Sequence, residues 1–148
     1  MSYPVLQSGL FAAPGSAELF LLARVLFGGV LAFMGLNHFR NLGNMAGYAG
    51  SKGVPAPGLA VAFTGGLLVL GGLSVIAGVF VVLGAGALAV FLLASAAGMH
   101  DFWTVEDPQQ QQTEMTQFLK NASLAGAAVG LLALGGVDWP YSVGVGLF

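Results

Sequence analysis

Few side chains in this 148-residue sequence can do chemistry, and the most unusual of them is Arg24. It lies close to the middle of an apolar run of about twenty residues, 17–36, where a charge inside a membrane is costly. Two interpretations are open. In one, Arg24 extends toward Glu18, Asp138 or a lipid headgroup. In the other, it is buried and binds helix carbonyls, Thr64 or an anionic ligand.

A second group of polar residues stands where the other apolar runs begin or end. His38 follows the first run, His100 and Asp101 follow a later one, and Lys120 with Asn121 opens the last. We expect these side chains to lie near one membrane face. The candidate ligand-binding residues are therefore Arg24, His38, Arg40, His100, Asp101, Trp103, Lys120 and Asn121.

Three kinds of chemistry fit this second group. The side chains form a polar cap that satisfies helix-end carbonyls, or they bind a quinone headgroup, whose carbonyls accept hydrogen bonds from His or Lys while Trp103 packs on the ring. Two imidazoles and a carboxylate are also ligands for a metal or a haem. No pair has a helix-spaced pattern such as HxxxH or ExxH. We therefore predict no metal site, disfavour haem, and keep a bound quinone as the cofactor hypothesis.

The elements that must position these residues are apolar helices. The chain is 57% hydrophobic and 7% charged, and residues 58–98 contain no Asp, Glu, Lys, Arg or His. A membrane-spanning helix needs about 20 apolar residues, so this stretch predicts two crossings joined by a turn at Gly78. The sequence predicts an all-α membrane protein, an antiparallel bundle of four transmembrane helices.

We predict one membrane domain over residues 1–148. It consists of an interfacial N-terminal arm at 1–16, helices at about 17–36, 58–77, 79–98 and 118–137, loops at 37–57 and 99–117, and a C-terminal tail at 138–148. Ser16 and Asp107 are expected to cap the first and last helices, and the last helix is expected to begin at Pro108, with residues 109–117 helical but outside the hydrocarbon. Gly126 and Gly130 form a GxxxG pair, which is typical of close helix packing in membranes.

The charged residues predict the orientation of the chain in the membrane, and the composition excludes several kinds of site. Arg40, Lys52 and Lys120 fall on the loop side, which predicts cytoplasmic loops and both termini outside. A net charge of −2 excludes a basic nucleic-acid surface, and the lack of cysteine excludes disulfides and thiolate ligands. Because no carboxylate stands in mid-span, proton-coupled transport is disfavoured.

Several short strings resemble the DoxX family of four-helix membrane proteins. They are Gly35-Leu-Asn-His38, Gly53-Val-Pro55-Ala-Pro57, Gly65-Gly66-Leu-Leu-Val-Leu-Gly71, His100-Asp-Phe-Trp103, Asp107-Pro108 and Phe118-Leu-Lys-Asn121, followed by Ala125-Gly126. The resemblance covers about residues 17–136. Two features depart from the family pattern. Thr64 stands where many members carry a glutamate, just before the Gly-Gly of the second predicted helix. Many members also have an Asp after a Gly-rich end of the last helix, and the residues around Asp138 differ from theirs.

The resemblance implies a multi-pass protein of a prokaryotic cell membrane, linked to respiratory or sulfur redox chemistry. Family members include subunits of quinol oxidase and of thiosulfate:quinone oxidoreductase. We expect a subunit that anchors a complex or shapes a quinone site, with its partners being lipid and either other redox subunits or further copies of the chain. Catalysis by this chain alone is not expected. The alternatives are an assembly protein without a ligand site and a small-molecule carrier that uses Arg24.

Overall fold

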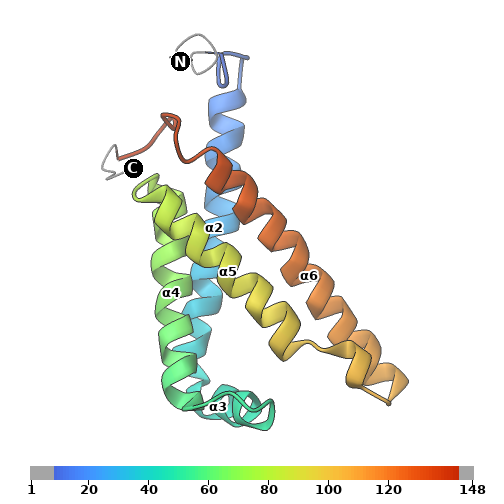
Figure 1. Cartoon of the computed structure of the whole chain (residues 1–148). Coiled ribbons are helices and arrows are strands. Elements are labelled where there is room, and N and C mark those ends of the chain that lie inside the picture. The colour runs from blue at the N-terminus through green and yellow to red at the C-terminus, as the bar shows by residue number, and fades with distance from the viewer. Residues whose placement is uncertain (1–8, 144–148) are drawn as a thin grey trace.

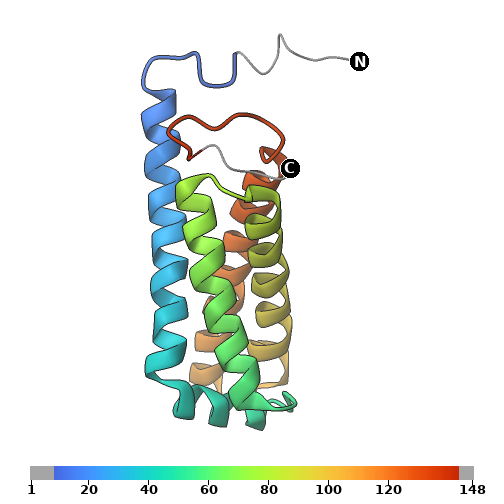
Figure 2. The same cartoon turned by 90° about the vertical axis from the view of Figure 1, so that its left-hand side faces the viewer.

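The computed structural model describes residues 9–143, and this part of the chain is helical, with no strand. Its helices are α2 (Ser16–Arg40), α3 (Leu42–Ser51), α4 (Pro57–Ala77), α5 (Val81–Met99), the short 3₁₀ helix η1 (Phe102–Thr104) and α6 (Pro108–Ala133). Helix α4 returns beside α2, and α6 returns beside α5 (Figure 1). Helix α3 lies at the end opposite the beginning of α2 (Figure 2).

Three of these helices are long and apolar enough to cross a membrane. They are α2, α4 and the segment Val81–Thr104, which contains α5 and η1. Helix α6 does not qualify because Gln117, Lys120 and Asn121 interrupt its apolar run. The all-helical membrane class is therefore confirmed, whereas the fourth crossing remains a proposal. Helix α6 begins at Pro108, which confirms the predicted start, and it ends at Ala133, before the predicted end at 137.

Helices α2 and α4 approach so closely that their contact requires glycine. A Cβ placed on Gly28 would lie 2.4 Å from the Gly72 carbonyl oxygen, and one on Gly35 would lie 2.6 Å from that of Gly65. Seven residues separate Gly28 from Gly35 and also Gly65 from Gly72, so both pairs recur along a single helix face. This spacing of small residues lets the two backbones pack in direct contact.

The other helices join through larger side chains. The core contains Leu31, Leu68, Val75, Leu88 and Leu92, with Ala125 and Ala128 of α6 packed against α5. A Cβ placed on Gly126 or Gly130, in contrast, would have no other atom within 4 Å. The predicted GxxxG pair therefore has no packing neighbour within the described chain, and the buried alanines take its place.

The helix boundaries follow local chemistry at most positions. Gly78 adopts φ 70° where α4 ends, which confirms the predicted turn, and Asp107 accepts a hydrogen bond of 2.8 Å from the Gln110 amide at the start of α6. The prediction for Ser16 is wrong, because Gly15 occupies the cap position and Ser16 already belongs to α2. Its enclosed hydroxyl has no partner among residues 9–143.

Candidate functional site

An apolar groove of about 660 Å³ opens between α4 and α5. Such a volume is within the range of small-molecule pockets. Phe63, Leu83 and Val90 are each more than two-thirds exposed and form its rim. Its ten lining residues, here called the α4–α5 groove, are Phe63, Thr64, Leu67, Val82, Leu83, Gly86, Ala87, Val90, Phe91 and Ala94. Thr64 is the only one with a polar side chain.

His38 of α2 contacts two residues that line this groove. Its Nδ1 lies 3.2 Å from Thr64 Oγ1 and 3.3 Å from the Val61 carbonyl oxygen, and its ring meets Phe91 edge to face at 6.3 Å between centroids. Gly65 leaves room for this arrangement, because a Cβ there would lie 2.9 Å from the His38 Cβ. The arrangement gives the groove one hydroxyl with an imidazole directly behind it.

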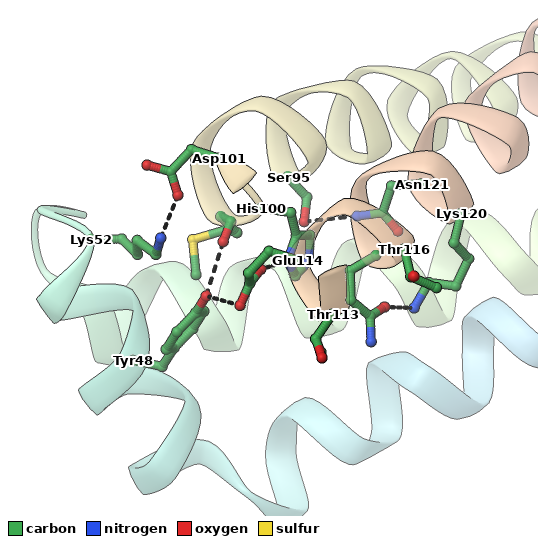
Figure 3. A network of polar contacts seen from close by, with 12 residues as sticks. Tyr48, Lys52, Ser95, His100, Asp101, Thr113, Glu114, Thr116, Lys120 and Asn121 are labelled. Atoms are coloured by element: carbon green, nitrogen blue, oxygen red, sulfur yellow. Dashed lines mark hydrogen bonds and ion pairs between the residues drawn. The ribbon is translucent and has the colours of Figure 1, made fainter. Parts of the chain in front are cut away.

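A separate polar network, here called the loop-side network, ties α3 to the end of α5 and the first half of α6 (Figure 3). His100 Nδ1 lies 2.8 Å from Glu114 Oε2, and Tyr48 donates to Glu114 Oε1 at 3.2 Å or to the Met99 carbonyl at 2.9 Å. Lys52 pairs with Asp101. The network holds the short α3 helix against two of the long helices.

Three groups of this network have shifted pKa values, and the hydrogen bond with Lys52 lowers that of Asp101. Partial burial raises the pKa of Tyr48, and the neighbouring Glu114 carboxylate raises it further. The hydrogen bond to Asp101 raises the pKa of Lys52. Tyr48 is therefore neutral and Lys52 positively charged throughout the neutral pH range.

Arg24 lies at the opposite end of the molecule and is fully buried. Its Nε donates to the Val75 carbonyl at 3.0 Å, Nη2 to Ile76 and Tyr141 at 2.5 and 3.2 Å, and Nη1 to Pro140 at 2.6 Å. Two of these carbonyls end α4, where the helix dipole is negative and favours a cation.

The C-terminal strap, residues 138–143, completes this end of the molecule. Trp139 is buried, with Arg24 5.2 Å from its ring centroid and Phe20 packed edge to face at 4.9 Å. Tyr141 donates to Glu18 Oε1 at 2.9 Å, and the Val143 amide donates to the Ala77 carbonyl at 2.9 Å. The strap thus connects the end of α6 to both α2 and α4.

The interpretation of Arg24 as a buried residue that binds helix carbonyls is therefore the one observed. Neither Glu18 nor Asp138 pairs with it, since Glu18 accepts from Tyr141 and Asp138 is exposed. Thr64 is not its partner either, because that hydroxyl bonds within α4 and to His38. Because the Arg24 guanidinium donates hydrogen bonds to four main-chain carbonyls, it has little remaining capacity to bind an anion.

The other predicted residues are dispersed. Arg40 is exposed at the end of α2, and Lys120 bonds Gln117 one turn earlier on α6. Asn121 is buried and donates to Ser95 Oγ at 3.2 Å. Trp103 is 57% exposed and belongs to an aromatic trio with Phe102 and Phe118, whose centroids lie 5.3 to 5.8 Å apart.

The structure thus divides the predicted candidates among separate settings. His100 and Asp101 join the loop-side network, while His38 packs against two residues of the groove, and no hydrogen bond links the two histidines. Within residues 9–143, no three His, Asp or Glu side chains converge as metal ligands would. Sequence reasoning missed Tyr48 and Glu114. The signals were present, because Glu114 is the one acidic residue between Asp107 and Asp138, and Tyr48 the one aromatic residue between Phe39 and Phe63.

The long apolar helices define a membrane protein, and comparison with known proteins adds its family. A family model described as DoxX matches residues 19–101, more than half of the chain. The chain therefore belongs to the DoxX family. No curated protein and no solved structure matches it. The matched region contains Arg24, His38 and the whole α4–α5 groove, but it ends before Glu114 and the C-terminal strap.

Proposed function

We propose that this chain is a membrane subunit that binds a quinone or quinol in the α4–α5 groove and supports electron transfer by a partner chain. The observation that carries the proposal is the combination of an apolar groove of about 660 Å³ with one hydroxyl, Thr64, backed by His38. Binding sites for apolar small molecules have this composition, with few polar groups that fix the orientation.

The two ends of a quinone match the two parts of the groove. The isoprenoid tail would lie along Leu67, Leu83 and Ala87, and the ring would lie between Phe63 and Phe91, near Thr64. An adjoining apolar pocket of about 560 Å³ shares those three tail-contacting residues, so the groove continues along α4 and α5 toward Phe80. A long apolar chain would therefore find a continuous surface.

The same proposal includes four membrane crossings, α6 being the fourth, in an antiparallel bundle. The polar first half of α6, with Glu114 bonded to α3, would lie at the loop-side surface, while its apolar second half, from Phe118 onward, would lie in the hydrocarbon. Arg40, Lys52 and Lys120 favour placing that surface in the cytoplasm of a prokaryotic cell. Redox centres would then belong to the partner.

Photolabelling with an azido-quinone tests the binding site directly. The label is expected on residues 63–94, and Ala87→Phe should abolish it by filling the shared part of the groove. Ala127→Phe is the matched control, because Ala127 is exposed on α6 and does not line the groove. Labelling of both variants at the unaltered level, or on other segments alone, would contradict the proposal.

A further inference from the structure

The hydrogen bonds around His38 determine which of its ring nitrogens carries the proton. Thr64 Oγ1 donates its single proton to a carbonyl of its own helix, at 2.9 Å from Ala60 or 3.1 Å from Val61. The hydroxyl therefore has only lone pairs to offer His38 Nδ1. The Val61 carbonyl, 3.3 Å from the same nitrogen, is also an acceptor. Two acceptors facing Nδ1 require Nδ1–H in the neutral ring.

The consequence is an unprotonated Nε2 that can only accept a hydrogen bond. Nε2 has no partner among residues 9–143. It is not enclosed either, because Ser16 Oγ is the one enclosed, unpartnered side-chain polar atom in that part of the chain. His38 is 9% exposed and does not itself line the groove, but its ring packs against Thr64 and Phe91, which do.

We infer that His38 Nε2 accepts a hydrogen bond from a ligand hydroxyl, and that Thr64 is the positioning residue that fixes this role. The inference rests on the proposed function and adds a selection rule to it. A reduced headgroup carries phenolic hydroxyls that can donate to Nε2, whereas an oxidised headgroup carries carbonyls that cannot. The site would therefore prefer the reduced form.

The size of this preference follows from the one hydrogen bond that only the reduced form makes. The net free energy of one such hydrogen bond corresponds to roughly tenfold in affinity. Replacing Thr64 by valine removes one of the two acceptors at Nδ1 and should lower the preference. Thr64→Ser keeps the hydroxyl and should retain the preference for the reduced form. This pair of variants separates the positioning role from a merely steric contribution.

Nitrogen-15 NMR of histidine-labelled protein tests the inference, because the chain has only two histidines and His100→Gln assigns their signals. At pH 8, above the ordinary histidine pKa of about 6.5, Nδ1 of His38 should be protonated. Reduced decylubiquinone should shift the Nε2 signal, and the oxidised form should leave it unchanged.

The contrary results separate this inference from the proposed function. A proton on Nε2, or equal shifts with both forms of the probe, would overturn the role of His38 while azido-quinone labelling of the groove still stood. No shift with either form would also overturn it. If the labelling failed as well, the proposed function would fall with it.

Discussion

At the scale of single residues, the guanidinium of Arg24 holds three segments together. Its donors bond α4 through Val75 and Ile76 and the strap through Pro140 and Tyr141, while the residue itself belongs to α2. A buried carbonyl that loses its donor costs about 1–3 kcal/mol. Arg24 is therefore a structural residue in this protein, and the carrier hypothesis that depended on it loses its binding charge.

Replacing Arg24 by leucine should lower the stability in detergent by roughly 3 kcal/mol or more, because four carbonyls lose their donor together. Arg24→Lys should give an intermediate loss, since an ammonium has three donors and cannot span the same positions. Thermal unfolding followed by tryptophan fluorescence measures both. Arg40→Gln is the control, because an exposed substitution usually changes stability by less than about 0.5 kcal/mol. Equal unfolding temperatures for all variants would refute the structural role.

The loop-side network predicts a pH dependence at the alkaline end. The pKa values of Tyr48 and Lys52 are raised in the folded protein. The stabilisation that each group gives is therefore complete below its ordinary pKa, about 10 for tyrosine and 10.4 for lysine, and it is lost as pH rises through the higher pKa of the folded state. Helix α3 should therefore stay attached from pH 7 to 9 and loosen above about pH 10.

Spin labels measure this loosening, since the chain has no native cysteine. Gly47→Cys on α3 and Gln112→Cys on α6 place labels at exposed positions. The distance distribution should broaden only above about pH 10. With Tyr48→Phe and Lys52→Met added, it should be broad at every pH. Broadening of the unmodified network between pH 7 and 9 would contradict the account.

The partners of Arg24 show why sequence reasoning reaches only part of the site. A lone arginine in an apolar run is conspicuous, but its acceptors are main-chain carbonyls, which every residue carries. No residue type marks Val75 or Pro140 as a partner, and Pro140 is 116 positions away. The hydrogen bond between His100 and Glu114 is different in kind, because both side chains are scarce in this chain and could have been paired by elimination.

At the scale of elements, the glycine contact between α2 and α4 is the most demanding packing in the molecule. Gly72→Ala would place a Cβ 2.3 Å from the Gly28 carbonyl oxygen. Such overpacking costs about 1–3 kcal/mol, because the two helices must move apart. Gly66→Ala, on the same helix, meets nothing within 4 Å and should be neutral or stabilising by up to about 1 kcal/mol. Denaturation in mixed detergent compares them, and equal effects would exclude the close contact.

Helix positions were largely predictable because uncharged runs of this length leave few alternatives. The predicted segments at 58–77 and 79–98 differ from α4 and α5 by at most two residues at each end. The last helix was less predictable, since Lys120 and Asn121 interrupt its apolar half directly after Phe118 and Leu119. Pairwise packing was not predictable either, because Gly126–Gly130 and Gly65–Gly72 look equally suitable in sequence, whereas only the second pair has a partner helix in the described chain.

At the scale of the whole molecule, α2 with α4 and α5 with α6 form two closely packed helix pairs that meet mainly along α4 and α5. The strap reinforces this junction at one end and the loop-side network at the other. The groove lies along the junction between these two ties. The arrangement gives a ligand access to the groove while the helix pairs stay connected.

Single introduced cysteines test the proposed four crossings. Ala13→Cys and Asp138→Cys should react with an impermeant maleimide from the same side of the membrane, and Ser51→Cys and Gln109→Cys from the other side. Intact cells and inverted vesicles distinguish the sides. Labelling of position 138 from the same side as position 51 would exclude α6 as a crossing and would require a different bundle.

Native mass spectrometry of the protein released from its own membrane in a gentle detergent tests the proposed quinone site without any added ligand. We predict one quinone-class molecule per chain, retained by Ala127→Phe and absent from Ala87→Phe. A chain that carries only phospholipid in all three forms, under conditions that preserve its fold, would contradict the proposed quinone site.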